Sequence, residues 1–371
     1  MIRRFYVHNF RCLENFELPL AGRSSTLLIG NNGSGKSTVA AALEVLQRIG
    51  RGTNRIKELV GLSDLTRNHT EIPIRFEIEV ELNGKTFGYT IALELPEGFK
   101  ELRVLEEKLI VNGQPIYTRE VASVHMASSG GVGDRQADFE IDWHLAALPI
   151  IQQRTAGDPL TIFKTWLGQI LILRPVPALI RGESTGETFQ PDPYVTQFGA
   201  WFSAVLAQAP SAYGEISLFL KQVMPDLKEI TNPKTGQDSR SLVVQFATDL
   251  GSFQVPFAAL SDGEKCFMIC SLVLTAKTAN NPVFCFWDEP DNYLSLSEVR
   301  HFVMALRRSF QNDGQLVTTS HNPEAIRSFS NENTLVLFRR NHLEPTQIRP
   351  LADLQVEGDL ISALIRGDVE P

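Results

Sequence analysis

A glycine-rich loop set between an apolar strand and an apolar helix carries the clearest chemistry in this sequence. Residues 30–38 read Gly-Asn-Asn-Gly-Ser-Gly-Lys-Ser-Thr and fit the phosphate-binding pattern G-x-x-x-x-G-K-[ST]. Residues 26–29 predict a short strand before the loop, and residues 38–47 predict a helix after it. This arrangement directs backbone N–H groups and a helix N-terminus at a polyphosphate. A polar turn that binds nothing is the alternative, and both flanking elements argue against it.

Each residue type in the loop has a physical role. The glycines let the backbone curl around an anion without Cβ clashes. Lys36 would reach the β- and γ-phosphates, and the Ser37 hydroxyl would bind Mg²⁺. The candidates for contacting the nucleotide are Gly30, Asn31, Asn32, Gly33, Ser34, Gly35, Lys36, Ser37 and Thr38.

A second group of candidate residues follows an apolar strand later in the chain. Residues 283–287 show no polar alternation, so we expect a strand buried on both faces in a mostly parallel sheet. Asp288 and Glu289 come directly after it. Asp288 would hold Mg²⁺ through water, and Glu289 would polarise an attacking water. The alternative is a buried strand followed by an ordinary acidic turn.

Two further motifs lie on either side of this strand. Ser261 and Glu264 form a capping box, with Gly263 between them, at the start of an apolar helix. A capped helix N-terminus is also a positively polarised anion site. Residues 316–319 predict a strand that delivers His321 to the carboxyl edge of the sheet, where ligands gather. A lone histidine is more often structural.

Hydrophobic periodicity predicts the elements that must position these residues. Alternating apolar residues and Asn-Gly turns predict antiparallel strands before residue 145, with a flexible tip at 128–133. Later segments predict a hairpin, helices and buried strands. The expected strands are 2–9, 15–20, 74–82, 87–95, 104–111, 115–118, 241–248, 251–256, 283–287, 315–319 and 334–339, and the expected helices are 198–206, 216–223, 262–278 and 297–310.

Composition is ordinary for a soluble protein. The chain has 371 residues, of which 43% are hydrophobic and 21% are charged, and its net charge is −8. No apolar run is long enough to span a bilayer, so we expect no membrane partner, and the first residues lack the apolar core of a signal peptide. The four cysteines show no paired metal-site spacing, and we expect a reduced cytoplasmic setting for them. The negative charge argues against coating nucleic acid through the overall field, although a local basic patch stays open.

The motifs together resemble an ABC-class ATPase head. Residues 30–38 match Walker A, 260–265 the signature, 284–289 Walker B, and His321 the switch histidine. The opening Phe-x-Val-x-Asn-Phe-Arg-Cys-Leu of residues 5–13 is similar to the start of RecF, SMC and OLD-type ATPases. The strands after Walker A also resemble the standalone AAA-like ABC ATPases of bacterial defence operons, such as Septu and PARIS.

The resemblance implies a P-loop ABC-ATPase head of the α/β class. It would have a mixed, mostly parallel core sheet, an antiparallel β subdomain and a helical insertion. The expected division is an ATPase lobe at 1–71, the β subdomain at 72–145, the insertion at 146–240 and the rest of the ATPase lobe at 241–371.

The resemblance also implies a function. Two copies would dimerise head to head around two ATPs, and Ser261, Gly263 and Glu264 would act in trans. Lys36, Glu289 and His321 would be catalytic. The cofactors would be ATP and Mg²⁺, with Ser37 and Asp288 on the metal and Arg11 among the nucleotide contacts. The head would switch a separately encoded effector, a nuclease, in anti-phage defence, and assembly beyond the dimer stays open.

Two other functions compete with this one. A RecF-like repair ATPase would bind duplex DNA, with Arg3, Arg4 and Arg11 on phosphates. The other is the ATP-binding subunit of a transporter.

Three features fit the ABC pattern poorly or lack a secure place in it. Asp262 stands where a glycine is expected, Ser295 stands where the D-loop ends in aspartate, and a Q-loop at Gln152 and Gln153 is equally well explained as solvated glutamines.

Overall fold

The described residues form two compact units. A computed structural model describes residues 1–127, 137–152, 157–276, 283–312 and 314–354. The first unit contains Met1–Arg23, Ile29–Ile170 and Leu335–Pro371, and the second contains Ser24–Leu28 and Leu171–Thr334. The expected flexible tip at 128–133 lies outside the described residues. The expected four-part division stays a prediction.

The first unit is built on an antiparallel sheet of eight strands in the order β2-β1-β4-β5-β6-β7-β8-β9. In β4, residues Ile74 to Val80 alternate between buried and half-buried, as the period-two pattern predicted. The antiparallel part of the fold is therefore confirmed. The strands are β1 (Ile2–His8), β2 (Phe16–Pro19), β4 (Ile74–Leu82), β5 (Lys85–Glu94), β6 (Arg103–Val111), β7 (Gln114–Glu120), β8 (Ser123–Met126) and β9 (Ala137–Glu140).

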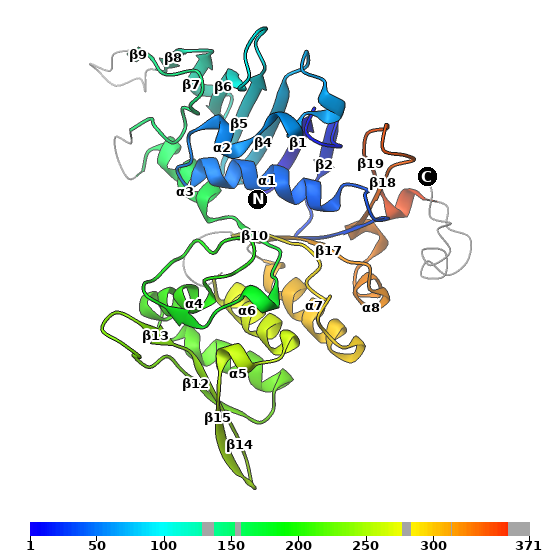
Figure 1. Ribbon diagram of the computed structural model, residues 1–371. Helices are drawn as coiled ribbons and strands as arrows, with labels where there is room; N and C mark the ends of the chain where they lie inside the picture. Colours follow the sequence, from blue (N-terminus) through cyan, green and yellow to red (C-terminus); the bar gives the residue numbers. More distant parts are fainter. Residues whose placement is uncertain (128–136, 153–156, 277–282, 313, 355–371) are drawn as a thin grey trace. The chain divides into compact units, whose positions relative to one another are not determined.

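Three helices of the first unit are α1 (Lys36–Gly50), α2 (Ile56–Leu59) and α3 (Pro159–Gln169) (Figure 1). The backbones of α1 and α3 approach closely, because a Cβ on Gly50 would lie 2.5 Å from the Gly168 nitrogen. Phe163 of α3 stacks on Phe87 of β5 at 6.0 Å between ring centroids. From Leu335 onward this unit also contains the antiparallel pair β18 (Thr334–Phe338) and β19 (Gln347–Pro350).

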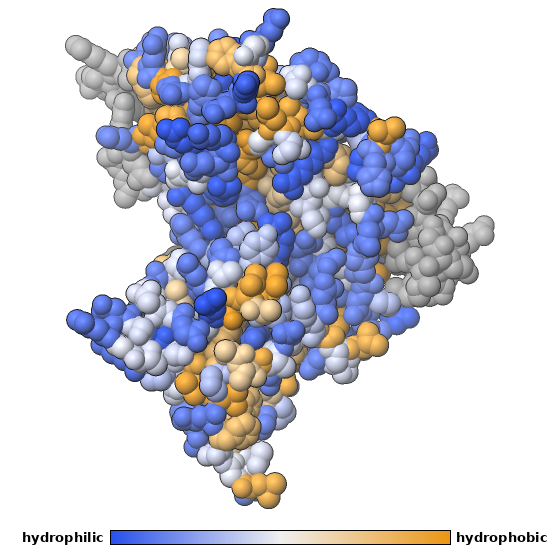
Figure 2. Space-filling view, viewed as in Figure 1, coloured by the Kyte–Doolittle hydropathy of each residue, from blue (hydrophilic) through white to orange (hydrophobic). Residues whose placement is uncertain are grey.

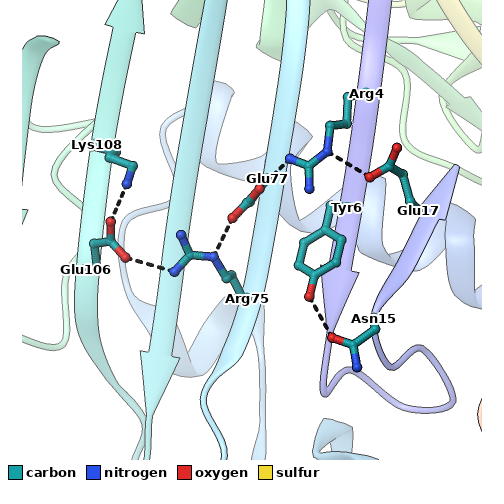
Figure 3. A network of polar contacts seen from close by, with 8 residues as sticks. All are labelled: Arg4, Tyr6, Asn15, Glu17, Arg75, Glu77, Glu106 and Lys108. Carbon is teal, nitrogen blue, oxygen red and sulfur yellow. Dashed lines mark hydrogen bonds and ion pairs between the residues drawn. The ribbon is translucent and has the colours of Figure 1, made fainter. Parts of the chain in front are cut away.

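The polar face of the eight-stranded sheet carries opposite charges in contact (Figure 3). Arg4 bonds to Glu17 and Glu77, and Arg75 bonds to Glu77 and Glu106, all at 2.5–2.8 Å. Burial raises the pKa of Glu77, but the hydrogen bonds from Arg4 and Arg75 lower it by more, so that its pKa lies below the ordinary value of 4.5. The charges on this face therefore largely cancel.

A buried carboxylate ties Ala147 and Leu148 to the sheet. Glu107 is fully buried and accepts hydrogen bonds from the Tyr89 and Tyr117 hydroxyls, both at 2.9 Å. It also accepts from the Ala147 and Leu148 amides at 2.6 and 2.9 Å. Burial, and then the carboxylate, raise the pKa of Tyr89 well above its usual range, so this hydroxyl stays a donor.

The second unit contains a parallel sheet with the strand order β10-β16-β17-β3. Its strands are β10 (Leu171–Leu173), β16 (Val283–Trp287), β17 (Gly314–Thr319) and β3 (Ser25–Ile29). Phe284 to Trp287 are buried, which confirms the expectation of a strand covered on both faces. The sequence did not predict β10, which falls within the segment expected to be helical and loop-rich.

Helices and a small sheet make up the rest of the second unit (Figure 1). The helices are α4 (Phe198–Gln208), α5 (Ala212–Val223), α6 (Asp262–Ala276), α7 (Leu296–Phe310) and α8 (Pro323–Arg327), and the expected end of α6 at 278 lies outside the described residues. The strands are β12 (Leu227–Thr231), β14 (Val243–Thr248) and β15 (Gly251–Pro256), with the short pair β11 (Glu183–Ser184) and β13 (Arg240–Ser241).

Apolar surface is exposed at the tip of the β14–β15 hairpin (Figure 2). Leu250 is fully exposed and Phe253 is 62% exposed. Within the part of the chain that the structure describes, no helix has the length and hydrophobicity that crossing a bilayer requires.

All four cysteines of the chain are buried and unpaired: Cys12, Cys266, Cys270 and Cys285. Burial raises the pKa of the Cys266 thiol to about 12. Burial also raises the pKa of the Cys270 and Cys285 thiols. These thiols are therefore inert under ordinary conditions.

Candidate nucleotide-binding site

The glycine-rich loop has the backbone conformation that its sequence predicted. Gly30, Gly33 and Gly35 have φ values of 148°, 80° and 106°, which side chains disfavour. At Gly30 a Cβ would lie 2.1 Å from the Leu337 carbonyl oxygen, so only glycine fits there. The loop can therefore turn its amides toward a bound anion.

Lys36 is the first residue of α1 and lies inside the curl of this loop. Its side chain is largely buried, and its ammonium group donates to the Gly30 carbonyl at 2.7 Å and to the Asn31 carbonyl at 3.3 Å. The first turn of α1 contains no acidic residue. The positive end of the helix and the lysine therefore act on the same small region.

Ser34 provides an independent sign that this loop takes a ligand. Its hydroxyl oxygen is buried and has no hydrogen-bond partner among the described residues. A buried hydroxyl without a partner is costly and calls for an explanation. A phosphate group would supply the acceptor, and oxygen-rich phosphates also match the amide and ammonium donors of the loop.

Arg11 is held by an acidic residue. Its φ is 53°, its Nε donates to Asp64 Oδ1 at 2.8 Å, and its guanidinium lies 5.1 Å from the centre of the Phe10 ring. The Arg11 amide also donates to the Asp64 carbonyl at 2.6 Å. A contact between Arg11 and a nucleotide stays a prediction.

In the second unit, one threonine hydroxyl binds both the Asp288 carboxylate and the Glu289 backbone amide after β16. Thr319 at the end of β17 is fully buried, and its hydroxyl donates to Asp288 Oδ1 at 2.6 Å. The same oxygen accepts from the Glu289 amide at 2.8 Å. One side chain therefore fixes both the Asp288 carboxylate and the backbone at Glu289.

The Glu289 side chain lies between a histidine and an asparagine. The backbone at Glu289 has a φ of 49°, a strained value for a residue with a side chain. His321 Nε2 lies 3.6 Å from Glu289 Oε1, and Asn292 Nδ2 donates to Glu289 Oε2 at 2.5 Å. Both carboxylate oxygens of Glu289 are therefore oriented by neighbours.

Asp291 connects the turn after Glu289 to the segment that bears His321. The Ser320 hydroxyl donates to Asp291 Oδ2 at 2.7 Å and accepts from the Asn322 amide at 2.9 Å. Burial raises the pKa of Asp291, and the hydrogen bond from Ser320 opposes this only in part. The Asp291 carboxyl group therefore holds Ser320, and Ser320 in turn holds Asn322, on the two sides of His321.

The parallel register brings these residues to one edge of the sheet. Trp287 pairs with Thr318, and Thr319 pairs with Leu28 of β3. Asp288 and Ser320 therefore emerge at the edge where β3 ends, and the chain runs from β3 directly into the glycine-rich loop.

The segment at the start of α6 is a capping box, as the sequence predicted. The Ser261 amide donates to Glu264 Oε2 at 2.7 Å, and the Glu264 amide donates to Ser261 Oγ at 3.3 Å. A Cβ on Gly263 would lie 3.1 Å from the Tyr293 carbonyl oxygen. The signature segment therefore packs on the turn that follows Glu289.

Comparisons with known proteins decide the family. The RecF/RecN/SMC N-terminal domain matches residues 1–344. The chain belongs to this family. The expected relation to RecF, SMC and OLD-type ABC ATPases is confirmed.

Solved structures of SMC heads share the fold. A crystal structure of an Smc head bound to the C-terminal winged-helix domain of ScpA aligns with a TM-score of 0.57 at 13% identity, over 95% of this chain and 98% of that one. An Smc head with an extended coiled coil, bound to the C-terminal domain of ScpA from Pyrococcus furiosus, aligns with a TM-score of 0.54 at 11% identity over 99% of both chains. The expected α/β head fold is confirmed.

A curated relative matches a short stretch. An OLD nuclease of Thermus scotoductus is 44% identical over 46 residues, which is 12% of this chain. The match spans 8% of the length of that nuclease.

A Mg²⁺ ion bound together with a phosphate ligand would need oxygen ligands from this RecF/RecN/SMC-family head. Mg²⁺ usually takes one or two protein oxygens, keeps several waters and binds substrate phosphates. Ser37 of the first unit carries a hydroxyl and Asp288 of the second unit carries a carboxylate, and their binding of Mg²⁺ stays a prediction. No cluster of three or more His, Cys, Asp or Glu side chains suited to a metal occurs in the described ranges.

Some predicted residues lie apart from these contacts. Gln152 is exposed, and Gln153 lies outside the described residues. Ser295 caps α7 and hydrogen-bonds to Glu298. Arg3 pairs with Glu81 at 2.5 Å, and Arg4 is part of the balanced sheet face, so their proposed contacts with DNA phosphates stay predictions.

Sequence reasoning missed the residues that hold the carboxylates in place. These are Thr319, Asn292, Asp291 and Ser320. A signal existed, because residues 318–320 are Thr-Thr-Ser at the end of an otherwise apolar strand. Buried hydroxyls require partners, and Asp288, the Glu289 amide and Asp291 supply them for Thr319 and Ser320.

Proposed function

We propose that this chain is a Mg²⁺-dependent ATPase that hydrolyses ATP with Glu289 as its general base. The observation that carries the proposal is the position of Glu289 after a buried parallel strand, with each carboxylate oxygen contacted by a different neighbour. Such constraint is expected of a group that must orient a water for in-line attack. The conformation of the glycine-rich loop supports the same conclusion.

The residues divide the work. The loop amides and Lys36 bind the phosphates and stabilise charge on the transferring group. Glu289 orients the attacking water and takes its proton, and His321 hydrogen-bonds the γ-phosphate from the same edge of the sheet. Ser37 and Asp288 would hold Mg²⁺, which supplies positive charge to the phosphate oxygens. Thr319 keeps Asp288 and Glu289 in register.

ATP would join two copies of the chain. Ser261 and Glu264 engage each other in a capping box at the N-terminus of a long helix, which suits the binding of an anion. We propose that this helix end contacts the γ-phosphate held by a second copy. The resemblance to ABC heads motivates this arrangement. Its direct test is the oligomeric state of the chain with and without ATP.

The Glu289→Gln substitution separates binding from turnover. It keeps the size of the side chain and its contact with Asn292 but removes the base, so we expect ATP binding with at least a hundredfold loss of kcat. Native mass measurement with ATP should show a dimer for this variant. The exposed Glu187→Gln is the matched control and should behave as wild type.

Two outcomes would contradict this function. Normal turnover by Glu289→Gln would remove Glu289 from the role of base. Equal ATP affinity in the wild type and in Lys36→Ala would show that the glycine-rich loop is not the nucleotide site. A variant that binds ATP but stays monomeric would contradict the sandwich alone.

For the biological role, we propose an ATP-driven switch that controls a separately encoded effector, a nuclease, in anti-phage defence. The similarity to a stretch of an OLD nuclease supports a link between this head and nucleases. The expected result is a nuclease that co-purifies with Glu289→Gln in the presence of ATP and separates when ATP is removed. Co-purification that ignores ATP, or no nuclease at all, would contradict the switch.

A further inference from the structure

The loop between β18 and β19 returns to the glycine-rich loop and contacts it through one threonine. Thr346 is only 3% exposed. Its hydroxyl donates to the Ser34 carbonyl at 2.9 Å, and its amide donates to the Cys12 carbonyl at 2.9 Å. All three residues belong to the first unit.

The contact is close at Gly35. A Cβ at that position would lie 2.7 Å from Thr346 Oγ1 and 3.1 Å from Cys12 Sγ. The backbone of the phosphate loop therefore rests directly on Thr346 and Cys12, with no space for a side chain between them. Movement of Thr346 would change the position of the loop at its last glycine.

Other contacts hold the β18–β19 loop in shape. The Arg67 guanidinium donates to the Leu343 carbonyl and pairs with Glu14. Arg339 donates to the Glu344 carbonyl at 2.6 Å. Thr346 is thus presented by a braced segment.

The geometry of the Ser34–Gly35 peptide links the Thr346 contact to phosphate binding. The Ser34 carbonyl and the Gly35 N–H belong to one planar trans peptide, so they point in opposite directions. A hydrogen bond that holds the carbonyl on Thr346 therefore directs the Gly35 N–H to the other side of the loop. That side is where amides of such loops meet phosphate.

We propose that Thr346 is a positioning residue of the nucleotide site, which orients the Gly35 amide toward the bound phosphates through its hydrogen bond to Ser34. This rests on the proposed ATP binding. Thr346 itself does not touch the nucleotide. It acts by removing the freedom of one peptide to rotate, so that the amide is already in place when the ligand arrives.

The test is equilibrium binding of ATP and of inorganic tripolyphosphate to purified variants, both with Mg²⁺. Thr346→Val removes the hydroxyl at nearly constant size, and we expect roughly tenfold weaker binding of both ligands, the usual effect of one lost hydrogen bond. Thr346→Ser keeps the hydroxyl and should bind within about twofold of the wild type.

Thr334→Val is the matched control. Thr334 is also buried, and its hydroxyl also donates to a backbone carbonyl at 2.9 Å, that of Ser330. Melting temperatures without nucleotide should fall similarly in both valine variants, whereas only Thr346→Val should lose affinity.

Each result discriminates. Wild-type affinity in a folded Thr346→Val protein, or a tenfold loss in Thr346→Ser, would overturn the role of Thr346 and leave the ATPase proposal intact. Equal losses in the two valine variants would show a general effect of stability and would also overturn it. If the wild type and Lys36→Ala bound ATP equally, the proposed function itself would fail.

Discussion

Replacing Thr319 with valine should damage the candidate catalytic centre without touching any group that contacts ATP. The Thr319 hydroxyl is the shared partner of the Asp288 carboxylate and the Glu289 amide. Valine has nearly the same shape but cannot donate or accept. The change therefore removes two hydrogen bonds at once and leaves the buried surroundings filled.

The size of the effect follows from the two bonds. A hydrogen bond to a charged group contributes about 1.5–3 kcal/mol, and a neutral one about 1 kcal/mol. If only the bond to Asp288 mattered for Mg²⁺, its loss would weaken Mg²⁺ binding by roughly 10–100-fold, since about 1.4 kcal/mol is a factor of ten in an equilibrium constant. The effect on catalysis should be larger still, because the left-handed backbone at Glu289 is strained by about 1–3 kcal/mol. The hydrogen bond from its amide to Thr319 helps to hold this conformation.

The assay is steady-state ATP hydrolysis as a function of Mg²⁺ concentration. We expect Thr319→Val to raise the Mg²⁺ concentration for half-maximal activity and to lower kcat by about 10–100-fold. ATP affinity without Mg²⁺ should not change, because the glycine-rich loop is intact. Thr319→Ser should restore most of the activity.

Thr318→Val is the control for a buried hydroxyl in the same strand. In the part of the chain that the structure describes, the Thr318 hydroxyl makes only a long contact of 3.4 Å, with the Thr319 carbonyl. Its replacement should leave the Mg²⁺ dependence unchanged. If Thr319→Val kept a wild-type Mg²⁺ profile and kcat, or if Thr318→Val changed them equally, the shared-hydroxyl reasoning would be refuted.

Two predictions concern stability. Glu107→Gln should lower the free energy of unfolding by about 3–5 kcal/mol, because it leaves buried Arg119 without its carboxylate. The control is Glu120→Gln at an exposed position, which should change this free energy little. Chemical denaturation measures both. The lowered pKa of Glu77 means that its stabilisation is complete above about pH 4.5 and is lost as pH falls through the folded-state pKa. Glu77→Gln should therefore flatten the acid decline of the melting temperature below pH 4.5, and an unchanged slope would contradict this.

Local pattern was sufficient for most elements of the fold. Residues 74–82 alternate because one face of the strand is buried, and residues 283–287 are uniformly apolar because both faces are. The strand Leu171–Leu173 could not be predicted in the same way. The short apolar run of residues 170–173 carries no period, and only pairing with Cys285 to Trp287 makes Leu171–Leu173 a strand.

In the candidate site too, the sequence predicts the residues of contiguous motifs but not those brought together by the fold. The sequence indicated Lys36 and Glu289 because their motifs are contiguous in the chain. It could not indicate Thr346, which lies 312 positions after Ser34 and meets it only through the fold. Hydrogen bonds between segments distant in sequence depend on the completed tertiary structure, and single-sequence patterns do not encode them.

The burial of all four native thiols has a practical consequence. Maleimide or spin-label reagents should find no accessible sulfur on the folded wild type, so a single cysteine placed at an exposed position would be modified alone. Exposed Ser63 and Glu187, which have no proposed role in ATP binding, offer two such positions. Distances between labels at these positions, measured by pulsed spectroscopy with and without ATP, would report directly whether two heads approach each other.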